Sequence, residues 1–80
     1  MTQGERVKKI RKSLDLTLEK FGEKLGVTKT TVSRIENGIN NLTDQMTKSI
    51  CREFGVDYIW LTTGEGEMFV DSDDDFIEKI

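Results

Sequence analysis

The residues with the clearest chemical potential in this 80-residue chain lie between positions 28 and 38. If this stretch is helical, 100° per residue places five polar side chains within an arc of about 140°, opposite Val32 and Ile35. These side chains, which we call the reading face, belong to Lys29, Thr30, Ser33, Arg34 and Asn37. All five can donate hydrogen bonds, and two are cationic. The pattern indicates a surface for hydrogen bonding to a partner.

Two short helices joined by a Gly-Val turn are expected to position this face. Thr17 opens the first helix, in which Phe21 and Leu25 share one side. Thr28 opens the second helix, and Gly38 closes it. A short polar-faced helix backed by another helix is the geometry of a helix-turn-helix unit.

Three further helices complete an all-α prediction. The first covers about residues 3–13, where Thr2 and Glu5 have the spacing of a capping box. Its outer face is expected to be basic, with Arg6, Lys8, Lys9 and Lys12. A fourth helix runs from a Thr43 cap to Phe54, and a fifth follows an Asp57 cap and stops at Gly64. Inward-facing side chains on these two helices are expected to be Met46, Ile50, Cys51, Phe54, Tyr58, Trp60 and Leu61.

The acidic residues are concentrated at the end of the chain. The formal net charge is -3, but residues 1–63 carry 11 Lys and Arg against 8 Asp and Glu, whereas residues 64–80 carry 1 against 7. The total charge therefore says little about what the helical body binds. We expect one domain over residues 1–69, with Met68 and Phe69 folded back onto it. Residues 70–80 are read as an acidic linker followed by the start of an oligomerisation segment, or as a frayed tail.

Several classes of protein are disfavoured by the residue inventory. The chain has one cysteine, Cys51, and no histidine, so neither an internal disulfide nor a zinc site is expected. Cys51 is interpreted as a small core residue rather than a reactive thiol. An enzyme is not expected, because only the carboxylates of residues 71–75 are dense enough for acid-base work. No metal, cofactor or membrane span is expected, and the protein is placed in the cytoplasm.

The run from Leu16 to Gly38, LTLEKFGEKLGVTKTTVSRIENG, closely resembles the phage repressor and Cro-like family of helix-turn-helix regulators, also called the XRE family. Residues 54–64, FGVDYIWLTTG, resemble its fifth helix. The resemblance implies a five-helix, lambda-repressor-like domain. It also implies a sequence-specific regulator of transcription, expected to be a repressor, that binds a double-stranded DNA operator as a homodimer.

The resemblance assigns roles to individual residues. It places the helix over about residues 29–37 in the major groove, with base contacts from Lys29, Thr30, Thr31, Ser33 and Arg34. Phosphate contacts are expected from helix starts, the following loop and the first helix, at Thr17, Leu18, Asn37, Asn40, Thr43 and Arg6. Arg11 and Glu36 match a structural ion pair of some phage repressors.

Two departures from the family leave a second function open. Many relatives have Gln where this chain has Leu18, and their next loop commonly carries Lys or Arg where this one has Ile39, Asn40 and Asn41. Both departures remove contacts to DNA. The alternative is therefore a protein-interaction module on the same fold, such as an antitoxin or anti-repressor, with a weakened DNA face.

Overall fold

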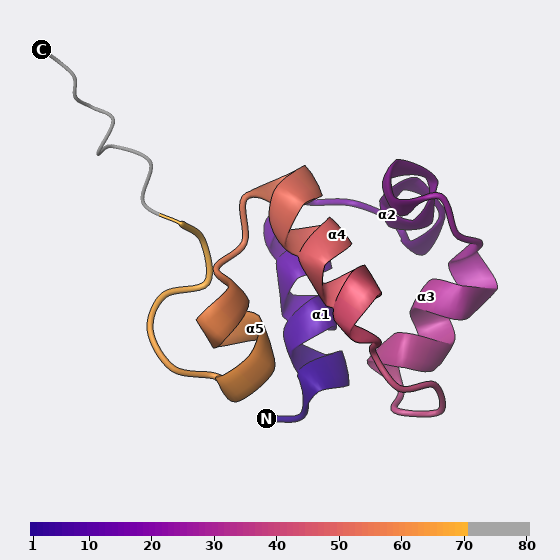
Figure 1. Cartoon of the computed structure of the whole chain (residues 1–80). Helices are drawn as coiled ribbons and strands as arrows, with labels where there is room; N and C mark the ends of the chain where they lie inside the picture. Colours follow the sequence, from indigo (N-terminus) through magenta and orange to yellow (C-terminus); the bar gives the residue numbers. More distant parts are fainter. Residues whose placement is uncertain (71–80) are drawn as a thin grey trace, which may run out of the picture.

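The structure is a computed structural model that describes residues 1–70, and within this range the chain forms five helices (Figure 1). They are α1 (Gln3–Ser13), α2 (Leu18–Leu25), α3 (Lys29–Glu36), α4 (Asp44–Phe54) and α5 (Tyr58–Thr63). The all-α prediction is confirmed. The self-association segment expected near the chain end falls in residues 71–80, outside the described residues.

Every helix begins directly after a predicted cap. The side chain at each cap accepts a hydrogen bond from a first-turn amide, which satisfies a donor that the helix itself leaves free. These caps are Thr2, Thr17, Thr28, Thr43 and Asp57. The turn between α2 and α3 begins at Gly26, whose φ of 79° is left-handed and favours glycine.

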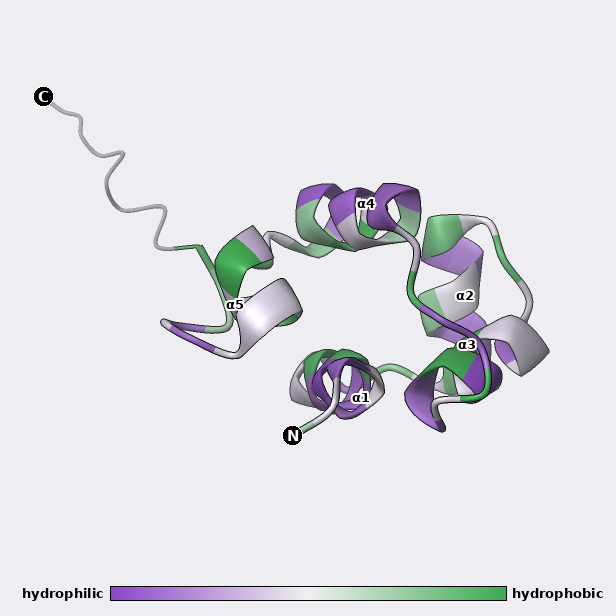
Figure 2. Cartoon of the chain, turned by 60° about the horizontal axis from the view of Figure 1, so that its bottom comes forward, coloured by the Kyte–Doolittle hydropathy of each residue, from purple (hydrophilic) through white to green (hydrophobic). Residues whose placement is uncertain are grey.

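The five helices share a single apolar core. Its buried members come from every helix and from the segment before α5, and they are Val7, Ile10, Phe21, Val32, Ile35, Ile50, Val56, Trp60 and Leu61. The rings of Phe21 and Phe54 stack with centroids 4.7 Å apart, which joins α2 to α4. Figure 2 shows the apolar sides of α1 and α4 turned toward the middle of the bundle.

The chain after α5 folds back onto the domain, as expected from the apolar residues Met68 and Phe69. Phe69 forms an antiparallel bridge with Val56, and both apolar side chains pack against the core. The amide of Asp57 donates to the Met68 carbonyl at 2.9 Å. Residues 65–70 therefore belong to the folded body.

Arg6 does not lie on the exposed face of α1, so that prediction is wrong. Its side chain is buried, and its guanidinium donates to the carbonyl oxygens of Leu61 (2.9 Å), Met1 (2.9 Å) and Thr62 (3.3 Å). The carbonyls at the end of α5 need donors from outside the helix, and Arg6 supplies them. Helical spacing alone could not show that this side chain turns inward.

The two aromatic residues of α5 have different environments. Trp60 is buried as predicted, whereas Tyr58 is 41% exposed. The Tyr58 hydroxyl donates to the Asp44 carboxylate at 2.8 Å, so the ring lies across the start of α4. The prediction that Tyr58 belongs to the core is wrong, because its polar end has a partner at the surface.

No helix within residues 1–70 is long and apolar enough to cross a bilayer.

Candidate nucleic-acid interface

The reading face of α3 is turned to solvent. Lys29, Thr30 and Arg34 are exposed, whereas Val32 and Ile35 on the opposite side are 1% and 6% exposed. Neither cation of this helix forms an ion pair with any described residue. Their charged groups therefore remain available to a partner.

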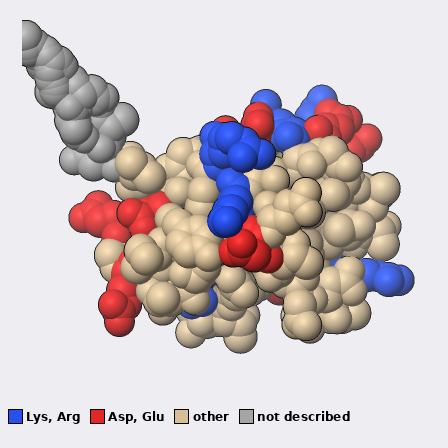
Figure 3. All heavy atoms as spheres, viewed as in Figure 1, with Lys and Arg blue, Asp and Glu red and all other residues tan. Residues whose placement is uncertain are grey.

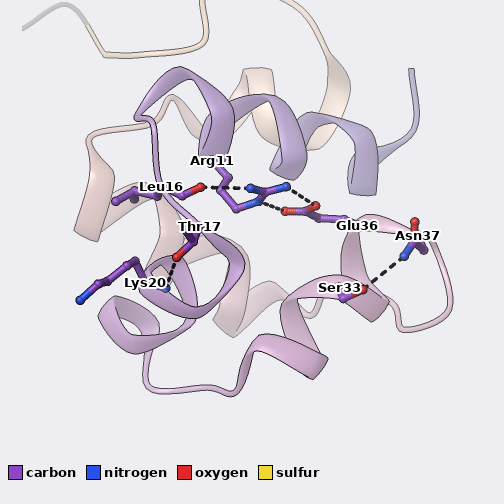
Figure 4. A network of polar contacts seen from close by, with 7 residues as sticks. All are labelled: Arg11, Leu16, Thr17, Lys20, Ser33, Glu36 and Asn37. Atoms are coloured by element: carbon purple, nitrogen blue, oxygen red, sulfur yellow. Dashed lines mark hydrogen bonds and ion pairs between the residues drawn. The ribbon is translucent and has the colours of Figure 1, made fainter.

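Thr31 and Ser33 already make contacts with the two caps of α3. The hydroxyls of Thr28 and Thr31 share a hydrogen bond at 3.1 Å, and Thr31 is half-buried. The side-chain amide of Asn37, which caps the end of α3, donates to Ser33 at 3.4 Å (Figure 4). Base contacts from Thr31 or Ser33 would therefore compete with, or share, these bonds.

Arg11 and Glu36 form the predicted ion pair. Arg11 Nε lies 2.7 Å from Glu36 Oε2, and Nη2 lies 3.1 Å from Oε1, so the contact is bidentate. The two side chains are only 13% and 5% exposed. The hydrogen bonds that Arg11 donates to Glu36 raise the pKa of the Arg11 guanidinium. The pair fixes the end of α3 against α1.

Arg11 also holds the start of α2, which the sequence did not reveal. Its Nη1 donates to the Leu16 carbonyl at 3.0 Å, immediately before the Thr17 cap (Figure 4). Thr17 Oγ1 accepts from the Lys20 amide, which leaves the amides of Leu18 and Glu19 without intrahelical acceptors. A single guanidinium therefore orients both the reading face and a predicted phosphate-binding amide.

The remaining predicted phosphate contacts differ in their availability. At the start of α4, Thr43 accepts from the Met46 amide, and the Asp44 carboxylate lies in the same turn. The main-chain amide of Asn40 donates to the Arg34 carbonyl at 3.2 Å, so only its side chain stays free. Arg6 is committed to main-chain carbonyls and is not available as a surface cation.

A close approach at Gly22 brings α2 and α3 together, and the sequence reading missed it. A Cβ added at Gly22 would lie 2.6 Å from the Val27 carbonyl oxygen, a distance that real Cβ contacts essentially never show. The spacing of a glycine four residues before the Gly26 turn was the available signal. Glycine at this position lets the turn pass directly over α2.

Charge is unevenly spread over the domain. Figure 3 shows acidic side chains over the α5 side of the molecule, while both signs are mixed elsewhere on that face.

Within residues 1–70 no cluster of three or more metal-ligating side chains occurs. Burial raises the pKa of the half-buried Cys51 thiol, which disfavours the reactive thiolate.

Two capped helices joined by a tight glycine turn, within five helices around one core, define a helix-turn-helix domain of the lambda-repressor-like fold. Residues 7–61 match the family model described as helix-turn-helix, so the chain belongs to this XRE-type family. The P22 c2 repressor, whose structure was solved in complex with the synthetic operator 9T, has the same fold. The two structures superpose with a TM-score of 0.74, and their sequences are 20% identical. The match covers 81% of this chain and 98% of the P22 c2 repressor chain.

Two curated relatives extend the comparison. Antitoxin PezA from Streptococcus pneumoniae is 34% identical over 65 residues, which is 81% of this chain and 40% of PezA. The propionyl-CoA carboxylase regulator of Cereibacter sphaeroides is 33% identical over 67 residues, which is 84% of this chain and 14% of the regulator. The chain therefore spans less than half the length of either relative.

Proposed function

We propose that this protein is a sequence-specific, double-stranded DNA-binding regulator of transcription that reads the major groove with α3. The observation that carries the proposal is the exposed reading face, on a helix whose far side is buried, with Lys29 and Arg34 in no ion pair among residues 1–70. Lys and Arg can donate to guanine O6 and N7, and the Thr30 methyl can pack on a thymine methyl. Family membership and the fold shared with an operator-binding repressor support this function.

The backbone of DNA would be held by two helix starts. The free amides after Thr17 and after Thr43 carry the positive ends of helix dipoles, which attract phosphate. One such domain covers little DNA, so the protein acts as a homodimer on two half-sites about one helical turn apart. Repression in the cytoplasm of a bacterium is the proposed setting.

The test combines site selection with a salt titration. Selection of bound sequences from random duplex DNA should yield a consensus with two half-sites. Affinity for the selected duplex should fall linearly on a log-log plot against salt, with a slope of about -0.9 per phosphate neutralised. Absence of duplex binding even at low salt would reject the proposal.

The similarity to an antitoxin favours a second candidate, a protein-interaction module on the same fold. Leu18 is half-buried against the core and Ile39 is 70% exposed, and both are apolar at positions where the family resemblance implies polar or cationic side chains. Under this alternative the main partner would be another protein, and duplex affinity would be weak at every salt concentration. The same titration separates the two functions.

A further inference from the structure

The first turn of α1 meets the last turn of α3 through the main chain at Gly4. A Cβ added at Gly4 would lie 2.3 Å from the Ile35 carbonyl oxygen and 2.9 Å from that of Glu36. Gly4 is buried, so this contact is closed to solvent. No side chain fits between the helices here, and backbone contact sets their separation.

Gly4 and Arg11 together hold the end of α3 at two points. They are seven residues apart, nearly two turns, and so lie on the same face of α1. Arg11 binds the Glu36 carboxylate at 2.7 Å, while Gly4 approaches the Glu36 carbonyl. One contact is made by a side chain and the other by the backbone.

The first turn of α1 is also fixed on its other side. Arg6 donates to the Leu61 and Thr62 carbonyls of α5, and Val7 is 1% exposed in the core. The chain beyond α3, residues 37–41, is exposed throughout. A bulkier residue at position 4 would therefore displace the end of α3 rather than α1.

We propose that Gly4 is a positioning residue for α3: by admitting direct backbone contact, it sets the tilt at which the reading face meets DNA. This inference rests on the proposed function. An alanine Cβ at position 4 would have to lie at least 3.0 Å from the Ile35 carbonyl oxygen, so the two main chains would have to move apart. Because an eight-residue helix is about 12 Å long, a shift of about 1 Å at one end tilts it by about 5°.

Such a tilt should weaken base reading more than backbone binding. Bidentate contacts to base edges depend on donor and acceptor directions as well as distances, so a small tilt disturbs them. The amides at the starts of α2 and α4 lie on other helices, and the contacts they make to phosphate carry no sequence information. Loss of discrimination is therefore the expected signature.

The test compares Gly4→Ala with Thr2→Ala in the full chain. Thr2→Ala removes the cap of the same helix, where Thr2 Oγ1 accepts from the Glu5 amide at 3.1 Å, and it leaves net charge and the α3 contact unchanged. In amide NMR spectra of folded protein, Gly4→Ala should shift the signals of residues 33–37, and Thr2→Ala should not. The ratio of selected-duplex to random-duplex affinity should fall about tenfold or more only in Gly4→Ala.

Each readout decides a separate point. Unshifted α3 amides would overturn the proposal regardless of DNA binding, and shifted amides with an unchanged affinity ratio would overturn the link to specificity. A wild-type protein without sequence preference would instead reject the proposed function, while the spectra still report on Gly4. If Gly4→Ala does not fold, a stabilising osmolyte is added to all three proteins and the comparison is repeated.

Discussion

The Tyr58 hydroxyl donates to the Asp44 carboxylate across 2.8 Å and so joins the first turns of α5 and α4. Lys48 approaches the other carboxylate oxygen at 3.2 Å. The hydrogen bond from Tyr58, followed by that from Lys48, lowers the pKa of Asp44. A negative charge is thereby kept at the start of α4, where it weakens the attraction of the free amides for phosphate.

Asp44→Asn is expected to raise affinity for duplex DNA. Removing one charge from the start of α4 should strengthen binding by about 0.5–1 kcal/mol at 0.1 M salt, or a few-fold, and less at high salt. Glu53→Gln is the matched control, because it makes the same charge change near the far end of α4, at an exposed position. Equal gains in the two variants would show that α4 does not approach the phosphates.

Stability should fall in acid partly because of two surface carboxylates. The pKa of Asp44 is lowered by Tyr58 and Lys48, and that of Glu5 by its hydrogen bond from the Thr2 amide. A lowered folded-state pKa gives stability that is present above the unfolded pKa and lost as pH falls through the folded value. Melting followed by circular dichroism should therefore show a decline below about pH 4. The decline should be smaller in Tyr58→Phe, and an unchanged profile would remove Tyr58 as the cause.

Glu36→Ala should lower both the melting temperature and DNA affinity. It would leave the guanidinium of Arg11, whose side chain is 13% exposed, without its bidentate partner, which costs roughly 3–5 kcal/mol in buried pairs. Glu23→Ala serves as the control, since the Lys20–Glu23 pair is long (3.9 Å) and exposed and should contribute little. A melting temperature equal to that of wild type would contradict the structural role of Glu36.

Arg6→Lys tests whether Arg6 is structural. Lysine keeps the charge but cannot reach three carbonyls with a planar fork, so the melting temperature should drop by several degrees. The slope of log affinity against log salt should stay the same, because no phosphate contact is lost. A slope that changes by about one unit would restore Arg6 as a phosphate contact.

Lys29→Ala and Arg34→Ala should each reduce discrimination between operator and random DNA by about 1–3 kcal/mol. Both side chains are exposed, so melting temperatures should remain close to that of wild type. Competition binding with the selected duplex and a random duplex provides the measurement. Equal losses on both duplexes would reassign the residue to phosphate binding.

The caps, turns and apolar periodicity were sufficient to predict the five helices, because each depends on neighbours a few residues away. Contacts between distant segments were not readable in the same way. Arg6 looked like one more cation on a basic helix, yet two of its three acceptors lie 55 and 56 residues further along. Gly4 carries no periodic signal, and the spacing of Gly22 before Gly26 does not show what it contacts; only the packed structure shows which carbonyls approach these two glycines. The reading face was predictable since it requires only helical geometry and a buried opposite side.

The contacts made by Arg6 and by residues 65–70 bear on how this domain can be shortened. The family pattern covers residues 7–61, yet Arg6 lies just before it, and Phe69, which pairs with Val56, lies after it. A fragment trimmed to the pattern would cut α5 after Leu61, remove the Arg6 donor to the Leu61 carbonyl and bare the part of the core that Phe69 covers. A fragment designed to fold alone should therefore keep Arg6 at one end and Phe69 at the other, beyond the part that identifies the family.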